Sequence, residues 1–324
     1  PVPVADQVTF SSNYSLSNFS VSENGVLVFW SGTGSSRQLV WFDRNGKQLG
    51  VAGPPGEYND ITLAPDEKRL AIQVIDGAKA DLWLMDLVRG ALSRFTFGNY
   101  EDDPVWSPDG NTIAFSSTRD SIFDIYRKQS SGAKNEEPVF KSGEGKETTD
   151  WSSDGRFLLY DRYDLNNGPD IWTLPLFGEG KPYPLLQSPF QEDQGHFSPD
   201  GHWFAYTSNE SGRKEVYVQS FPQSGGKWQI STAGGAQPHW RGDSKEIFYI
   251  GLDRKLMAVD LTFGESLVAS SPQSLFQTQV NRFDAPNRYV AARDGQRFLV
   301  NSPVEQASTT PITVVLNWTA GLKK

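Results

Sequence analysis

One stretch of the sequence decides the fold: Asp102-Asp103-Pro104-Val105-Trp106-Ser107-Pro108-Asp109-Gly110-Asn111-Thr112-Ile113-Ala114-Phe115. Pro108 fixes φ near the value that the second position of a turn needs, and Gly110 can adopt a positive φ. The residues on either side of the turn are β-branched or aromatic, which favours strands. The stretch therefore predicts a β-hairpin that follows an acidic loop.

The same turn recurs along the chain. Its third position falls at residues 24, 66, 109, 154, 200, 243 and 294, at intervals of 42 to 51 residues. Most of these units contain a later strand that opens with an acidic, an aliphatic and an aromatic residue, as in Asp124-Ile125-Tyr126. A period of this length, filled with about four short strands, is typical of the blades of a β-propeller.

We expect one all-β domain over residues 1–324, built from four-stranded antiparallel blades. Its units start near residues 16, 58, 102, 148, 193, 237 and 287. Seven turns favour seven blades, and six is the alternative if the turn at Asp294, which follows the longest interval, forms no blade of its own. The last unit lacks a fourth strand, and the N-terminal run Val8-Thr9-Phe10 is expected to supply it and close the ring.

Two segments, residues 106–115 and 197–206, follow one repeat: a hydrophobic residue, Ser-Pro-Asp-Gly, two variable residues, then hydrophobic-Ala-hydrophobic. On these residues the chain resembles the TolB-like branch of the WD-repeat-like β-propellers, over essentially its whole length. The resemblance implies the fold but says little about activity, because propellers host many unrelated functions.

The C-terminal residues 312–318, followed by a short basic tail, are similar to the end of certain bacterial membrane-anchored serine/threonine kinases. In those proteins a kinase domain and one transmembrane helix precede an extracytoplasmic propeller. This resemblance implies a sensor domain with a periplasmic or extracytoplasmic location, and no signal peptide is visible at Pro1. The sequence lacks the kinase motifs, so any kinase activity would belong to a separate domain.

Composition excludes several classes of function. The net charge of −9 argues against a nucleic-acid surface and against contact with an anionic membrane. The absence of Cys excludes thiol catalysis and Cys-ligated zinc. No Gly-x-Ser-x-Gly motif is present. We therefore expect a non-catalytic binding, sensor or protein-interaction propeller that engages its ligand at the channel mouth or the loop face. The alternative is an enzyme that uses the central channel, such as a metal-assisted lyase or hydrolase.

Acidic residues stand just before or within the predicted inner strand of four units. They include Asp60, Glu101, Asp102, Asp103, Glu147, Asp150 and Asp193. Propeller geometry would gather them into an arc at one channel mouth, suited to a divalent cation or to a basic group of a partner, with no other cofactor expected. Ordinary turn chemistry of Asp explains the same pattern.

Two of the three His residues, His196 and His239, occupy equivalent positions one residue before the aromatic of the turn motif. They could face the channel and are added to the candidate binding residues, although packing between blades or hydrogen bonds to neighbouring backbone are the more common roles of a lone His. The loops between the second and third strands vary most, and they make Tyr163 and Arg213 plausible contacts. The sequence does not identify the ligand.

Overall fold

The computed structural model describes residues 10–11, 16–17, 19–30, 36–164, 168–178, 180–223, 225–264, 266–280, 287–304 and 312–318. Every regular element within these ranges is a β-strand. Over the same residues there is no helix with the length and apolar character needed to cross a membrane. The all-β prediction is confirmed.

Five consecutive segments each form one antiparallel sheet, called blades 1 to 5. Blade 1 contains β7 (Tyr58–Leu63), β8 (Arg69–Asp76), β9 (Lys79–Asp86) and β10 (Ala91–Arg94). Blade 2 contains β11 (Glu101–Trp106), β12 (Thr112–Ser117), β13 (Asp124–Gln129) and β14 (Glu137–Phe140). Blade 3 contains β15 (Lys146–Trp151), β16 (Phe157–Asp164), β17 (Gly168–Pro175) and β18 (Tyr183–Pro184).

Blade 4 contains β19 (Glu192–Phe197), β20 (Trp203–Ser208), β21 (Glu215–Ser220) and β22 (Lys227–Gln229). Blade 5 contains β23 (Gly235–Trp240), β24 (Glu246–Gly251), β25 (Lys255–Phe263), β26 (Leu267–Ala269) and β27 (Gln273–Gln277). Both β26 and β27 pair with β25, so this blade has five strands. The long interval that the sequence shows before Asp294 is therefore accounted for by an additional outer strand.

Blade 6 combines the two ends of the chain. It contains β28 (Tyr289–Ala291), β29 (Arg297–Pro303), β5 (Arg37–Asp43) and β6 (Gln48–Gly56). β29 pairs with β5 from Arg297↔Asp43 to Pro303↔Arg37. The inner strand β28 contacts β7 of blade 1 and β23 of blade 5, which completes the ring. Joining both ends within one blade removes an exposed sheet edge.

Six apolar clusters fill the six interfaces between neighbouring blades. The cluster that contains Leu39, Ile61, Leu70 and Leu299 joins blade 6 to blade 1, and all four side chains are fully buried. Because every interface of the ring has such a cluster, the core is distributed around the central axis.

The turn motif has the structural role expected of it. In blade 2 the Ser107 hydroxyl donates to Asp109 at 2.6 Å, and Asp109 Oδ1 accepts the backbone N–H of Asn111 at 3.0 Å. The aromatic residue before the turn ties blades together, because the Trp106 indole donates to the Thr62 carbonyl of blade 1 at 3.0 Å.

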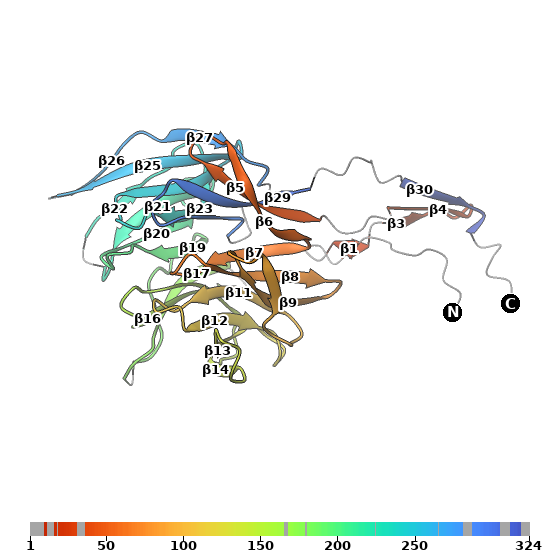
Figure 1. Ribbon diagram of the computed structural model, residues 1–324, viewed down its shortest axis with the longest axis horizontal. Helices are drawn as coiled ribbons and strands as arrows, with labels where there is room; N and C mark the ends of the chain where they lie inside the picture. The colour runs from red at the N-terminus through yellow and green to blue at the C-terminus, as the bar shows by residue number, and fades with distance from the viewer. Residues whose placement is uncertain are drawn as a thin grey trace.

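The blade count needs one correction. Seven antiparallel sheets of three or more strands correspond to the seven turns, but six of them surround the channel, so the six-blade alternative describes the ring. The seventh sheet has three strands, β3 (Phe19–Val21), β4 (Val26–Trp30) and β30 (Ile312–Leu316). It stands apart from the blades (Figure 1). The physical reason is that β5 takes the third position of blade 6, which leaves β30 to pair with β4.

The N-terminal segment does close the ring, through β5 and β6. Residues 8 and 9 lie outside the described ranges. Phe10 belongs to β1 (Phe10–Ser11), which pairs with β2 (Leu16–Ser17) and not with blade 6.

Candidate functional site

The six inner strands surround a channel with two chambers. The wide chamber has a volume of about 430 Å³ and is lined by all six blades, including Thr62, Val105, Asp150, His196 and His239. The narrow chamber holds only about 20 Å³ and is lined by Asp103, Glu147, Asp161, Asp193 and others. His196, Thr149 and Asn287 line both chambers, so the two are continuous.

A β-bulge near the start of the inner strand aims polar side chains into the channel. In β11 the register shifts between Asp102 and Val105, and β7, β19 and β23 contain similar shifts. Asp103, Gln194 and Gln237 have positive φ values at these bulges. Bulges of this kind commonly re-orient side chains beside functional sites.

One position within these bulges differs between blades. Asp60, Asp103, Gln194 and Gln237 each lie four residues before the first residue of the turn. The Gln194 side-chain oxygen accepts the backbone N–H of Gln237 at 2.8 Å, and the Gln237 oxygen accepts that of Arg288 at 2.9 Å. Amides therefore connect blades 4, 5 and 6. Blades 1 and 2 have carboxylates at the same position, which can only accept hydrogen bonds when ionised.

These carboxylates form the core of an acidic cluster. Asp60, Asp102 and Asp103 each place a carboxylate oxygen within 4.8 Å of the others. Asp60 is 0 % exposed and Asp103 is 3 % exposed. Asp60 Oδ1 accepts the backbone N–H of Ile61 at 2.8 Å. The Oδ2 atoms of Asp60 and Asp103 are buried without a hydrogen-bond partner within the described part of the chain. Unpaired buried oxygens are costly to desolvate.

The pKa values of the cluster reflect this crowding. Burial, and next the Asp102 carboxylate, raise the pKa of both Asp60 and Asp103 well above the usual range of Asp. Burial together with Asp102 also raises the pKa of Glu147 to about 7, against a hydrogen bond from Tyr163 that lowers it. Each carboxyl therefore resists ionisation first because it is buried and next because its neighbours are acidic, while the charge of Arg288 lowers the pKa of Asp60.

The structure brings most of the predicted acidic residues to this end of the channel. Glu147 and Asp193 line the narrow chamber. The Tyr163 hydroxyl donates to Glu147 at 2.6 Å, so one of the predicted loop contacts also lies there. Glu101 instead forms an ion pair with Arg119 at 3.0 Å, and Arg213 pairs with Glu215 at 3.0 Å. Neither Glu101 nor Arg213 belongs to the described lining of the chambers.

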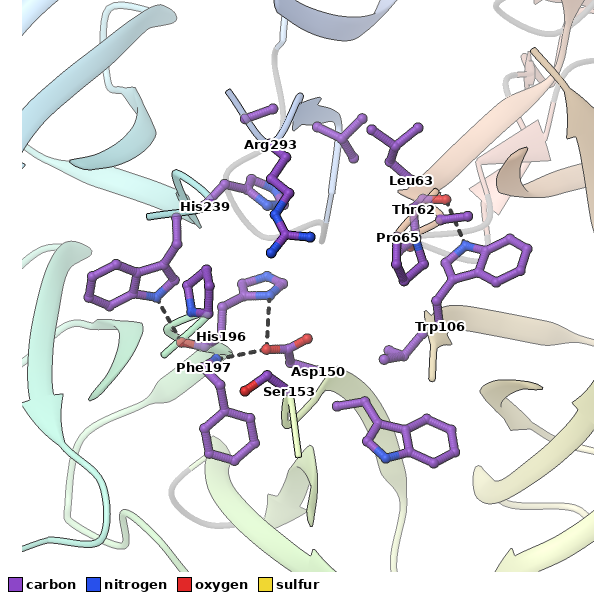
Figure 2. A pocket seen from close by; sticks show the side chains of 18 of the residues that line it. Thr62, Leu63, Pro65, Trp106, Asp150, Ser153, His196, Phe197, His239 and Arg293 are labelled. Carbon is purple, nitrogen blue, oxygen red and sulfur yellow. Dashed lines mark hydrogen bonds and ion pairs between the residues drawn. The ribbon is translucent and has the colours of Figure 1, made fainter. Parts of the chain in front are cut away.

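The wide chamber contains His196, His239 and Asp150 (Figure 2). The two imidazole rings lie 4.9 Å apart between centroids, and His196 Nδ1 is 4.0 Å from Asp150 Oδ2. The same Asp150 oxygen accepts the backbone N–H of Phe197 at 2.7 Å. Burial lowers the pKa of His196 to about 4 and raises the pKa of Asp150 to about 7, so both groups favour the neutral form.

Sequence reasoning did not single out several channel residues. Asp161 and Gln194 line the narrow chamber, and Arg293 lines the wide one. Aligning the turns of the six blades on their third position would have found Arg293, because it stands where the other five blades have Pro, Ser or Gly. Asp161 lies within β16, where the motif gives no signal.

Comparisons with known proteins agree with this architecture. No family model matches the sequence. The uncharacterized protein Atu1656 of Agrobacterium fabrum is 26% identical over 207 residues, which cover 59% of this chain and 69% of that protein. The solved structure of a putative TolB from Agrobacterium tumefaciens superposes with a TM-score of 0.69 at 18% identity, covering 84% of this chain and 100% of the other.

Two further solved structures extend the comparison. TolB from Acinetobacter baumannii has a TM-score of 0.55 at 19% identity, with 86% of this chain and 66% of that chain covered. Oligogalacturonate lyase in complex with manganese has a TM-score of 0.52 at 12% identity, with 83% and 97% covered. The fold is that of a TolB-like β-propeller, as the resemblance in the sequence predicts. The similarity of residues 312–318 to kinase-linked propellers stays a prediction.

Proposed function

We propose that this protein is a non-catalytic binding propeller that takes up a cation at the narrow, acidic end of its channel. The observation that supports the proposal best is the convergence of Asp60, Asp102 and Asp103, with buried oxygens of Asp60 and Asp103 that lack a partner in the described structure. The similarity in fold to TolB proteins is consistent with a partner-binding role and with an extracytoplasmic location.

A cation would offset both the burial of these carboxylates and the repulsion between them. Carboxylates held near one another repel, and a positive charge between them favours their ionised form. Oxygen ligands suit hard cations such as Ca²⁺ and Mg²⁺, with Ca²⁺ at about 2.3–2.6 Å from each oxygen. Oxygens within 4.8 Å of one another can all contact one such ion. Of the three aspartates, Asp103 lines the narrow chamber, and the small volume of that chamber favours a single ion over a bulky side chain.

The enzyme alternative has less support. A metal-assisted reaction at His196 and His239 would need a third ligand nearby. Among the described residues, the three acidic or His side chains that could share one metal ion are those of the aspartate cluster, and this group does not include His196 or His239. One protein of similar fold is a lyase in complex with manganese. At 12% sequence identity this similarity supports a shared fold and gives no support for a shared reaction.

The test measures thermal unfolding with CaCl₂ or MgCl₂, against NaCl at matched ionic strength, for the wild type and for Asp103→Asn. Asn is a suitable replacement because Asp103 has a φ of 49°, a conformation that Asn tolerates. Asp253→Asn is the matched control, since Asp253 is an acidic residue in an outer turn that pairs with Lys255 at 2.8 Å.

We expect a divalent cation to raise the unfolding temperature of the wild type and of Asp253→Asn, and to leave Asp103→Asn almost unchanged. Binding to the folded state alone stabilises by mass action, about 2.7 kcal/mol when the free ion is at 100 times its Kd. Equal responses of all three proteins, or no response to any divalent cation, would refute the cation site.

A further inference from the structure

We propose that the wide chamber is a second binding site, which takes the carboxylate of a monoanionic ligand with an apolar body through Arg293. The proposal is independent of the cation site, because it concerns the opposite end of the channel. It starts from the rim of the wide chamber, where the second residue of each turn faces the opening. These six residues are Pro65, Pro108, Ser153, Pro199, Gly242 and Arg293.

Arg293 alone breaks the pattern of this rim, because the other five residues are small or cyclic and uncharged. One charged side chain on a rim whose other residues are uncharged points to a ligand of opposite charge. Figure 2 shows the Arg293 side chain extending into the chamber towards His196, with Asp150 beyond it. The guanidinium makes no hydrogen bond or ion pair within the described part of the chain.

The local structure holds Arg293 in place without using its charge. Glu67 accepts the backbone N–H of Arg293 with one oxygen and pairs with Arg297 at 3.1 Å through the other. The Arg293 carbonyl accepts the N–H of Gly242 at 2.8 Å. A Cβ added at Gly242 would lie 2.2 Å from Arg293 Cγ, so the missing side chain leaves room for the arginine stem. Glu67 is thus engaged by a backbone N–H and by Arg297, and the Arg293 guanidinium stays available.

The chamber itself defines the ligand. Its volume of about 430 Å³ is in the usual range for small-molecule sites. Aliphatic walls come from residues such as Ile61, Leu63, Val105 and Val290, and these would cover an apolar body. Of the described lining residues, Arg293 is the one Lys or Arg. A guanidinium presents paired N–H donors that match the two oxygens of a carboxylate.

The same residues disfavour a doubly charged anion. Asp150 supplies no positive charge, and His196 and His239 are held neutral by burial, which lowers the pKa of both. One positive charge therefore faces a site that offers no second cation among its described residues. We infer a preference for a carboxylate over a phosphate monoester.

The experiment is isothermal titration calorimetry of the full chain with two carboxylates, 3-phenylpropionate and N-acetyl-dialanyl-leucine, each paired with its primary amide, and with phenyl phosphate. The variants are Arg293→Gln and Arg293→Lys. Arg254→Gln is the matched control, because Arg254 is exposed, makes no described side-chain interaction and lies outside both chambers. Circular dichroism checks that each variant is folded.

We expect at least one acid to bind and its amide to bind weakly, with phenyl phosphate no better than the acid. Arg293→Gln should weaken acid binding about tenfold, Arg293→Lys less, and Arg254→Gln not at all. Binding of the peptide acid alone would assign the site to a polypeptide C-terminus, and binding of the small acid alone to a metabolite. Equal binding of acid and amide, failure of both acids to bind, or no loss in Arg293→Gln would overturn the proposal.

Discussion

Replacing Asp150 with Asn should remove part of the pH dependence of stability. Asp150 lies in β15, where its Oδ2 accepts the N–H of Phe197, and burial raises its pKa from 3.8 to about 7. An acid with a raised pKa in the folded state binds more protons there than in the unfolded chain. The contribution of Asp150 to the free energy of unfolding is therefore most favourable at low pH and is lost as the pH rises from about 4 through 7.

The size of the effect follows from the shift. Three pKa units correspond to at most about 4 kcal/mol at about 1.4 kcal/mol per unit. The Asp150 side chain is 25% exposed, and solvent screening reduces the figure to about 2 kcal/mol. Asn keeps an oxygen that accepts the Phe197 N–H, so the variant removes the ionisation with little change in shape.

The assay is urea unfolding of the wild type and Asp150→Asn at a series of pH values between 4 and 8. Relative to the wild type, the free energy of unfolding of the variant should rise by about 2 kcal/mol across this range. Glu137→Gln, an exposed outer-edge change, should keep the wild-type slope. Parallel pH profiles for Asp150→Asn and the wild type would show that Asp150 titrates normally and that this reasoning is wrong.

Three further outcomes test the architecture. Gly242→Ala should lower the free energy of unfolding by about 1–3 kcal/mol in urea titrations, because its Cβ would also lie 2.7 Å from the Arg293 carbonyl oxygen. A chain that ends at Val304 should keep the main calorimetric unfolding transition, because β30 pairs with β4 and not with a blade; a lost transition would contradict the six-blade ring. Trp106→Phe should cost about 1 kcal/mol or more, since the Thr62 carbonyl loses its indole donor, and an unchanged midpoint would contradict that role.

The blades were predictable because their turn chemistry is local. Pro108, Asp109 and Gly110 specify one hairpin without reference to the rest of the chain, and the spacing of such turns specifies the repeat. The pairing of β5 with β29 was not predictable, because no local signal states which distant strand will occupy an open edge. Counting turns therefore correctly indicated seven sheets of three or more strands among the described residues, but did not show that one of them stands outside the ring.

In the channel, too, some features could be predicted from the sequence and others required the structure. The acidic residues of blades 1 and 2 were recognisable from their position before the inner strand, but their burial and unpaired oxygens required the bulge geometry. Glu101 resembles its neighbour Asp102 in sequence, yet the strand alternation places it against Arg119. Arg293 was visible only by comparison of turn positions, and its orientation into a chamber depends on the closure of blade 6.

The register of blade 6 also determines how the ring responds to mechanical load. The chain enters β5 at Arg37 and leaves β29 at Pro303, and these two residues face each other at one end of the ladder. Tension on the two ends would therefore break the pairing of β5 with β29 one residue pair at a time, starting at Arg37 and Pro303, instead of shearing the whole ladder at once. Further along both arms, β4 pairs with β30, with Trp30 opposite Ile312. A force applied to the two ends of the chain therefore has to separate β4 from β30 before it reaches the pairing of β5 with β29.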